Sequence, residues 1–248
     1  MQNIFTLTGK VILVTGASSG IGRAVAQQCA IAGATCIITA RNQTRLKETL
    51  DSLVGSGHKM IITDLNNANE IEELAIQLPQ LNGIVCCAGI VETKILKFTE
   101  DLDLNQLFET NTFSVIRLIR IILQQKKIQK EASIVIISSI SGIKCGYIGG
   151  SIYGASKAAL EGFAKATALE LSPQRIRINT ITPGMIETPL LKESDISNEQ
   201  IERDKLRYPL KRYGSPNEIG YAVIFLLSNA TRWITGTSLL IDGGYTLN

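Results

Sequence analysis

Seven short hydrophobic runs recur along the chain, and longer segments with a helical spacing of apolar residues separate them. Most of the runs are continuously apolar and rich in Ile and Val, which is typical of strands covered on both faces of a parallel sheet. The runs predict strands at Lys10–Thr15, Thr35–Ala40, Met60–Asp64, Gly83–Cys87, Ala132–Ser138, Arg175–Ile181 and Ser238–Asp242.

The segments between these runs predict helices. They cover Gly20–Ala32, Asn42–Leu53, Asn67–Leu78, Leu102–Lys127 and Ile152–Leu171. The longest of them places Leu104, Leu107, Phe108, Val115, Leu118 and Ile122 on its inward face. A further helix is predicted to begin at Ser215, because Ser caps a helix, Pro216 suits its first turn, and Glu218 completes a capping box.

The alternation of strands and helices predicts the α/β fold class, in which right-handed crossovers build a doubly wound parallel sheet. We expect a single-domain Rossmann-like sheet of about seven strands with helices on both faces. No linker or shift in composition divides the chain, so residues 1–248 are predicted to form one domain. The polar stretch 188–210 is too long for an ordinary connection and is predicted to be a substrate lid.

Composition and charge narrow the classes of function. The chain has 248 residues, of which 45% are hydrophobic, so it can bury a core without a structural metal or disulfide. The net charge of +3 argues against nucleic acid as a partner. No apolar stretch reaches the ~18 residues of a membrane span, and the N-terminus lacks the pattern of a signal peptide. The five cysteines, an odd number without a Cys-x-x-Cys pair, indicate a reducing, cytoplasmic compartment.

A glycine-rich loop at 15–22 follows the first predicted strand and leads into the first helix. Gly16 allows a sharp turn, Gly20 allows a ligand to approach the backbone, and Gly22 allows the helix to pack against the strand. The N-terminus of that helix offers free N–H groups and a positive dipole end to a phosphate. The predicted phosphate-binding residues are Gly16, Ser18, Ser19, Gly20, Ile21 and Gly22, although turns also use glycine for purely structural reasons.

The residue after the second predicted strand indicates which dinucleotide binds. In Rossmann folds an acidic side chain about 20 residues beyond the glycine loop binds the 2′-hydroxyl of NAD. Here Ala40-Arg41-Asn42 supplies no carboxylate, and Arg41 is suited to a bidentate contact with the 2′-phosphate of NADP. The sequence therefore favours NADP over NAD; the alternative is that Arg41 is an ordinary solvated loop residue.

Tyr153 and Lys157 lie four residues apart at the start of a predicted helix, so they share one face of it. An ammonium beside a phenol favours the phenolate, so the pKa of Tyr153 is predicted to lie below its usual value of about 10. Such a phenol is a general acid–base near neutral pH, whereas most pairs with this spacing are solvated helix surface. Ser138, Ser139 and Ser141 follow the fifth predicted strand, where a hydroxyl is placed to hold a substrate carbonyl or simply to form a turn.

These motifs, in this order, resemble the short-chain dehydrogenase/reductase family over essentially the whole chain. They are TGASSGIG at 15–22, Asp64, CAG at 87–89, Asn111, ISSISG at 137–142, YGASK at 153–157, PGMIET at 183–188 and LLIDGG at 239–244. Two features depart from the family's usual pattern. Cys86-Cys87-Ala88-Gly89 replaces Asn-Asn-Ala-Gly, and the stretch from Ser139 to Tyr153 is slightly longer.

The resemblance implies a role for each matching residue. Tyr153 would donate or accept the proton, and Lys157 would lower its pKa and hold the nicotinamide ribose. Ser139 would bind the substrate oxygen, with Ser138 and Ser141 as alternatives, and Asn111 would position a water that links Lys157 to solvent. The remaining cofactor contacts would be Asp64 and Leu65 at the adenine, Gly89 near the adenosine ribose, Ile186 and Thr188 at the nicotinamide carboxamide, and also Ala88, Pro183 and Gly184.

The sequence thus predicts an NADP-dependent oxidoreductase that reduces a ketone to a secondary alcohol. Its nearest resemblance is to 3-oxoacyl-[acyl-carrier-protein] reductases of fatty acid biosynthesis, so the substrate would be a small-molecule or acyl-carrier-bound ketone. Sugar, polyol and other alcohol dehydrogenases share the motifs and remain alternatives, as does a non-catalytic NADP-binding sensor or scaffold. By the resemblance, the helices at Leu102–Lys127 and Ile152–Leu171 would form a homotetramer; the alternative is internal packing. No nucleic acid, membrane or metal is expected as a partner.

Overall fold

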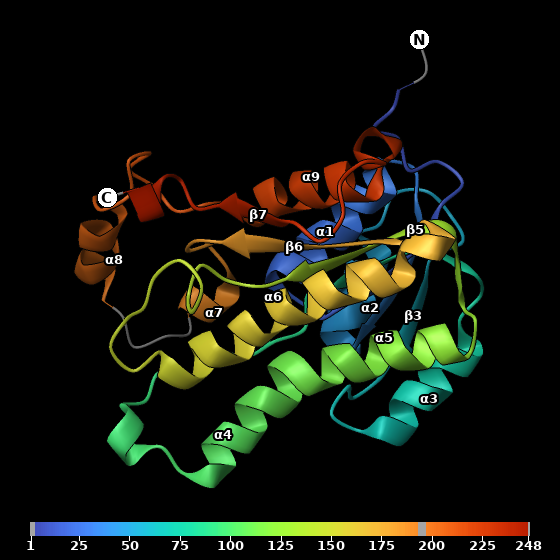
Figure 1. The fold of residues 1–248 in the computed structure, drawn as a ribbon. Coiled ribbons are helices and arrows are strands. Elements are labelled where there is room, and N and C mark those ends of the chain that lie inside the picture. Colours follow the sequence, from blue (N-terminus) through green and yellow to red (C-terminus); the bar gives the residue numbers. More distant parts are fainter. Residues whose placement is uncertain (1–2, 193–196, 248) are drawn as a thin grey trace.

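The strands form one parallel sheet that runs through the middle of the molecule (Figure 1). A computed structural model describes residues 3–192 and 197–247 of the chain. The strands are β1 (Val11–Thr15), β2 (Thr35–Ala40), β3 (Lys59–Ile62), β4 (Leu81–Cys86), β5 (Ile128–Ile137), β6 (Arg177–Pro183) and β7 (Ser238–Ile241). They lie in the order β3-β2-β1-β4-β5-β6-β7, and every neighbouring pair is parallel. The predicted α/β class and doubly wound sheet are therefore confirmed.

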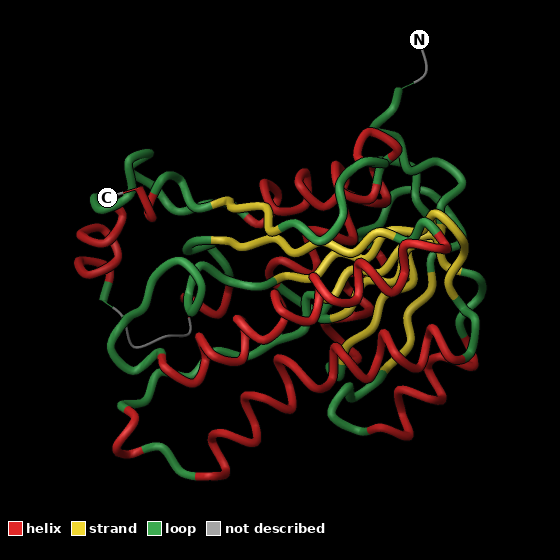
Figure 2. The backbone as a smooth tube through the Cα atoms, in the orientation of Figure 1, coloured by secondary structure: helices red, strands yellow, loops and turns green. Residues whose placement is uncertain are grey.

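Helices cover both faces of this sheet, as Figure 2 shows by colour. They are α1 (Gly20–Ile31), α2 (Gln43–Asp51), α3 (Ala68–Gln77), α4 (Asp101–Phe108), α5 (Ser114–Gln124), α6 (Ser151–Leu171), α7 (Pro189–Lys192), α8 (Asn198–Lys205) and α9 (Pro216–Leu227). Helices α3, α5 and α6 pack on one face, and α1, α2 and α9 pack on the other. Among the described residues, no helix is long and apolar enough to cross a membrane.

The central strands are buried on both faces because their side chains alternate between two cores. Leu13, Ile84 and Ile134 lie side by side on β1, β4 and β5 and face the core under α3, α5 and α6. The residues that follow two of them in sequence, Val14 and Val85, face the core under α1 and α9. The continuous apolar runs therefore mark strands with two covered faces, as predicted.

The predicted helix at Leu102–Lys127 is wrong in one respect, because it is two helices. Helices α4 and α5 are joined by a π-helical segment, Glu109–Phe113, and α5 ends before Lys126, where the chain turns with a φ of 53°. The wider π-helical turn changes the face that each half presents to the core. Leu107, Val115, Leu118 and Ile122 are buried as predicted, whereas Leu104 and Phe108 are only half-buried.

Most strands differ from their predicted bounds by one or more residues, and β3, β5 and β6 show the physical reasons. Strand β3 spans Lys59–Ile62, where Met60–Asp64 was predicted; it lies at the edge of the sheet and leaves Lys59 and Ile62 exposed. Strand β5 begins earlier than predicted, at Ile128, because a left-handed residue at Glu131 and a shift in register form a β-bulge that keeps the strand paired. Strand β6 begins later, because Arg175 adopts a left-handed φ of 56°.

The predicted lid at 188–210 contains two short helices that the sequence pattern did not predict, α7 and α8. Helix α8 begins with a capping box, in which Ser197 and Gln200 each accept a backbone N–H of the other. This Ser-to-Gln spacing is a helix-start signal that was present in the sequence. Residues 193–196 of the predicted lid lie outside the described residues, and its role as a lid remains a prediction.

Candidate active site

The loops that carry the predicted cofactor motifs meet at the carboxyl ends of the strands. Gly16 has a φ of 63°, and a Cβ placed on it would lie 2.8 Å from the Cα of Ala88 in the loop after β4. A Cβ on Gly20 would lie 3.3 Å from the Cγ2 of Thr188, which follows β6. A Cβ on Gly184 would lie 3.1 Å from the Cα of Asp242. Gly184 also donates its N–H to the carbonyl of Ile241. The structure therefore brings the motifs after β1, β4, β6 and β7 together.

The N-terminus of α1 has the backbone geometry of an anion-binding site. A Cβ on Gly22 would lie 2.2 Å from the carbonyl oxygen of Gly16, so the helix can start this close to the loop only with glycine. Ser19 occupies the N-cap position, but its side chain caps no N–H of α1. Side chains do cap α2, α3, α8 and α9, through Asn42, Asn67, Ser197 and Ser215. The first N–H groups of α1 thus remain available for a phosphate.

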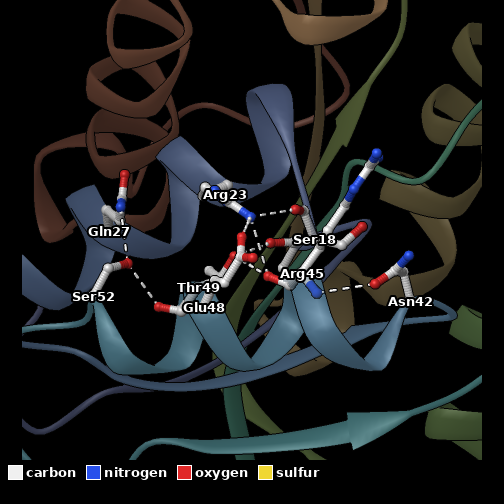
Figure 3. A network of polar contacts seen from close by, with 9 residues as sticks. Ser18, Arg23, Gln27, Asn42, Arg45, Glu48, Thr49 and Ser52 are labelled. Carbon is white, nitrogen blue, oxygen red and sulfur yellow. Dashed lines mark hydrogen bonds and ion pairs between the residues drawn. The ribbon is translucent and has the colours of Figure 1, made fainter.

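A cleft of about 520 Å³ opens beside this helix end. It is lined by the glycine loop together with residues of α1, α2, α7 and α9: Ser18, Ser19, Gly20, Arg23, Ala24, Gln27, Arg45, Glu48, Pro189, Pro216 and Asn217. Figure 3 shows how α2 is fastened to the glycine loop along this cleft. The guanidinium of Arg23 donates to the carbonyl of Ser18 at 2.8 Å and to the carboxylate of Glu48 at 3.0 Å. The hydroxyl of Thr49 donates to the carbonyl of Ala17 at 2.9 Å.

Two cations stand at the start of α2. Arg41 is exposed directly after β2, and among the described residues it forms no ion pair. Arg45 lies one helical turn further on and lines the cleft, while its backbone N–H is capped by the side chain of Asn42 at 2.9 Å. Arg45 is not among the residues predicted from the sequence, although its spacing of four residues from Arg41 was a usable signal. The glycine cradle, the uncapped helix end and these cations fit an anionic dinucleotide.

Asp64 and Leu65 follow β3 at the same edge of the sheet. Leu65 is buried, and Asp64 is half-buried. The Asp64 carboxylate accepts the N–H of Asn66 at 3.0 Å, and its backbone N–H donates to Glu70 at 2.7 Å. These bonds hold the turn between β3 and α3 in place beside the predicted adenine position.

Tyr153 lies half-buried in the first turn of α6, and the pKa of its phenol differs from the prediction. Burial raises the pKa of Tyr153 above its usual value of 10.0, and a hydrogen bond with Ser139 opposes this only in part. The ammonium of Lys157 does not offset the burial, because it donates instead to the carbonyl of Ile137 at 3.0 Å. Burial also lowers the pKa of Lys157 to about 8. The predicted lowering of the phenol pKa by Lys157 is therefore wrong for this structure.

Ser139 is the serine that contacts Tyr153. Its Oγ also accepts the N–H of Ser141 at 3.1 Å, which fixes the turn after β5. The hydroxyl of Ser138 points to α6 instead and donates to the carbonyl of Lys157 at 3.1 Å. Of the three candidate serines, the geometry thus favours Ser139 for a substrate oxygen.

Asn111 lies in the π-helical segment and is fully buried. Its side chain accepts the N–H of Ile90 at 2.8 Å and donates to the carbonyl of Ile90 at 3.0 Å and to the hydroxyl of Ser156 at 3.1 Å. Ser156 in turn donates to the carbonyl of Tyr153 at 2.8 Å, a link that the sequence analysis missed. A Cβ on Gly89 would lie 3.1 Å from both Asn111 Oδ1 and Lys157 Nζ, so these two polar groups converge beside the loop after β4.

The cysteines that replace the family's two asparagines leave this loop intact. The hydroxyl of Thr15 accepts the N–H of Cys87 at 3.1 Å and that of Ala88 at 3.3 Å, so the backbone is held from β1. Burial raises the pKa of Cys86 to about 12 and that of Cys87 further, so both remain neutral thiols. Thr15 is a positioning residue that the sequence analysis did not single out.

A Rossmann-type sheet with this cradle and this Tyr–Lys pair defines a class of oxidoreductase, and the chain belongs to the short-chain dehydrogenase/reductase family. A family model described as enoyl-(acyl carrier protein) reductase matches residues 16–246. The chain is 34% identical over 239 residues to the 3-oxoacyl-[acyl-carrier-protein] reductase FabG of Escherichia coli (strain K12), which covers 95% of this chain and 97% of that protein.

Other relatives carry different names. A tropinone reductase homolog of Arabidopsis thaliana is 35% identical over 254 residues, or 98% of this chain and 92% of that protein. Among solved structures, a short-chain type dehydrogenase/reductase from Mycobacterium marinum superposes with a TM-score of 0.88 at 30% identity, over 99% of this chain and 98% of that one. The resemblance drawn from the motifs is therefore confirmed at the level of the family.

Proposed function

We propose that the protein is an NADP-dependent reductase that converts a ketone to a secondary alcohol, reversibly. The observation that carries this proposal is the convergence of Tyr153, Ser139, Lys157 and Asn111 beside the glycine cradle. A module that only bound the dinucleotide would need the cradle but no acid–base pair beside it. The proposed sensor or scaffold is therefore the weaker alternative.

The nicotinamide, when bound, supplies a hydride to the carbonyl carbon of the substrate. The protein's task is to hold the carbonyl oxygen and to provide the proton. Ser139 and Tyr153 are placed to donate hydrogen bonds to that oxygen, and the Tyr153 proton passes to it as the alkoxide forms. The ammonium of Lys157 can then replace the proton that Tyr153 has lost, because the pKa of Lys157, about 8, lies close to neutral pH.

Two basic residues support the preference for NADP. Arg41 occupies the place of the acidic residue that would bind a 2′-hydroxyl, and Arg45 lies four residues further on and lines the cleft. A guanidinium binds a phosphate through two charge-assisted hydrogen bonds, whereas its hydrogen bond to a neutral hydroxyl is much weaker. The same proposal includes cofactor contacts by Gly16, Ser18, Ser19, Gly20, Ile21, Gly22, Asp64, Leu65, Ala88, Gly89, Tyr153, Lys157, Pro183, Gly184, Ile186 and Thr188.

A 3-oxoacyl thioester on an acyl carrier is the substrate class that the FabG relatives support. A cyclic or other small ketone is the second candidate, supported by the tropinone reductase homolog. A turnover assay with NADPH should compare a 3-oxoacyl thioester, an enoyl thioester, cyclic ketones and sugars. Faster reduction of the 3-oxoacyl thioester supports the first candidate, and a failure to reduce any of these while NADPH binds would leave the sensor or scaffold.

The cellular setting and assembly belong to the same proposal. All five cysteines are free thiols, which suits a reducing, cytoplasmic compartment. Leu102 on α4, Phe113 beside α5 and Leu169 on α6 are 71%, 49% and 77% exposed, which supports a homotetramer built on these helices. Sedimentation at micromolar concentration tests this, and a monomer would contradict it.

A further inference from the structure

The connection between β5 and α6, residues 138–150, is built around one aromatic side chain, Tyr147. A Cβ placed on Gly150 would lie 2.5 Å from the Cε1 and Cζ atoms of the Tyr147 ring, so the ring lies directly on this glycine. Gly150 is the N-cap residue of α6 and donates its N–H to the carbonyl of Tyr147 at 3.0 Å. The ring is thereby seated on the end of the helix whose first turn carries Tyr153.

A second segment, the loop after β4, fixes the orientation of this ring. The carbonyl of Gly149 accepts the N–H of Lys94 at 3.0 Å, and a Cβ on Gly149 would lie 2.8 Å from the methyl group of Thr93. The methyl of Thr93 therefore packs on the connection. Its hydroxyl lies close enough to the Tyr147 phenol to oppose, in part, the rise that burial causes in the pKa of Tyr147. Gly150 and Thr93, from two segments of the chain, thus lie beside one exposed aromatic side chain.

The Tyr147 phenol is available to a ligand in spite of these contacts. Tyr147 is 43% exposed, whereas Tyr153 is half-buried and less exposed to solvent. The Tyr147 ring lies on Gly150, the N-cap residue of α6, which precedes Tyr153 by three residues. Tyr147 is also one of the groups that raise the pKa of Tyr153. Partial burial also raises the pKa of Tyr147, so its hydroxyl stays protonated at neutral pH and can donate a hydrogen bond.

We propose that Tyr147 is a specificity residue that binds a second oxygen of the substrate, the ester or thioester carbonyl of a 3-oxoacyl group. This inference rests on the proposed reductase function. Tyr153 and Ser139 hold the oxygen that reacts, and Tyr147, oriented by Thr93, donates to an oxygen that does not. The substrate class is then a ketone with a carbonyl two carbons away, in preference to a ketone without one.

The test compares two substrates of equal chain length, ethyl 3-oxobutanoate and 2-heptanone, in wild type and Tyr147→Phe. Phenylalanine keeps the ring on Gly150 and removes only the hydroxyl. We expect kcat/KM for the oxo ester to fall about 5- to 30-fold, mostly through KM, because the lost bond is to a non-reacting group. The value for 2-heptanone and the affinity for NADPH should stay within about twofold of wild type.

Two further variants keep the proposal falsifiable if Tyr147→Phe is poorly folded. Thr93→Val removes the orienting hydroxyl at nearly constant volume. It should lower kcat/KM for the oxo ester by a smaller factor than Tyr147→Phe does, and it should leave the value for 2-heptanone unchanged. Tyr221→Phe, on α9 and 56% exposed, is the matched control and should change neither substrate.

Equal losses for both substrates would show that Tyr147 only packs the connection, and no loss for either would show that it binds nothing; both outcomes overturn the proposal. A wild type that reduces 2-heptanone as well as the oxo ester overturns it as well, while the reductase function stands. A wild type that binds NADPH but reduces neither overturns the reductase function, and this inference with it.

Discussion

The cofactor side and the substrate side of the candidate active site are held together in different ways. On the cofactor side, backbone lies against backbone: Gly16 leaves no room for a Cβ beside Ala88, and Gly22 leaves none beside Gly16. On the substrate side, side chains from distant segments make the contacts, as Tyr147 does with Thr93. Close packing of backbone on the cofactor side requires glycine at fixed positions, so it appears in the sequence as a motif. Many different pairs of side chains can make the contacts of the substrate side, so these contacts leave no motif.

Tyr153 lies where the cofactor side and the substrate side meet. Removing its hydroxyl should therefore slow the reaction while NADPH and the ketone still bind. We expect Tyr153→Phe to lower kcat by about 10²–10⁴-fold, because the proton donor is gone while the ring still fills its buried site. Steady-state rates with a verified ketone and a fluorescence titration with NADPH measure the two effects. Near-normal turnover in this variant would show that another group supplies the proton.

Lys157→Met should lower kcat by a similar factor and also weaken NADPH binding, since the resemblance gives Lys157 a contact with the ribose. Burial lowers the pKa of Lys157 to about 8 and raises that of Tyr153, so the pair releases its first proton at about pH 8. Alcohol oxidation needs the pair without this proton, so its rate should rise with pH through about 8; ketone reduction should fall through the same value.

In Lys157→Met the rising limb for oxidation should move to a pH above 10, because only the burial-raised phenol remains to titrate. A pH profile of kcat/KM in both proteins checks this. A limb that stays at about 8 in the variant would assign that proton to a group other than the Tyr–Lys pair.

Arg41→Asp tests the cofactor side alone. Losing a charge-assisted contact with the 2′-phosphate should weaken NADPH about 10- to 100-fold, and the new carboxylate should favour the 2′-hydroxyl of NADH. The ratio of kcat/KM for two ketones should not move, because the substrate side is untouched. Lys130→Asp, an equal charge change at an exposed site, is the control. Equal affinities for NADPH and NADH in the wild type would contradict the role of Arg41.

The smallest effect should separate two helix ends. Ser215 caps α9, so Ser215→Ala should lower the free energy of unfolding by about 1 kcal/mol without changing NADPH affinity. Ser19 caps nothing in α1, so Ser19→Ala should leave stability within about 0.5 kcal/mol. Urea unfolding measures both. A loss at Ser19 as large as that at Ser215 would mean that Ser19 caps α1 in solution, which would remove one argument for the phosphate site.

The capping box of α9 also predicts a pH effect. Arg212 and the backbone of Ser215 hold the pKa of Glu218 at about 2, below its usual value of 4.5. The folded pKa is depressed, so the stabilisation is present above about 4.5 and is lost as the pH falls towards 2. Glu218→Gln should flatten the acid side of the stability curve, and an unchanged curve would mean that the pair contributes nothing.

The boundaries that failed did so for local reasons that periodicity does not contain. The bulge at Glu131 keeps a polar segment in β5, and the π-helical segment carries Asn111 inside what looked like one helix. Both depend on neighbouring strands and helices that accept the irregular backbone. The choice among Ser138, Ser139 and Ser141 likewise required the position of α6, because all three hydroxyls follow the same strand.

The sequence by itself determined the sheet, its two covered faces, the family and the residues that meet at its carboxyl edge. These depend on hydrophobic period and on glycine positions where a Cβ has no room, and both are properties of short segments. Only the tertiary structure decided that burial raises the pKa of the Tyr153 phenol in spite of Lys157, and that the Tyr147 ring lies on Gly150. The balance of desolvation against charge, and contacts between side chains far apart in the chain, exist only once the elements are packed.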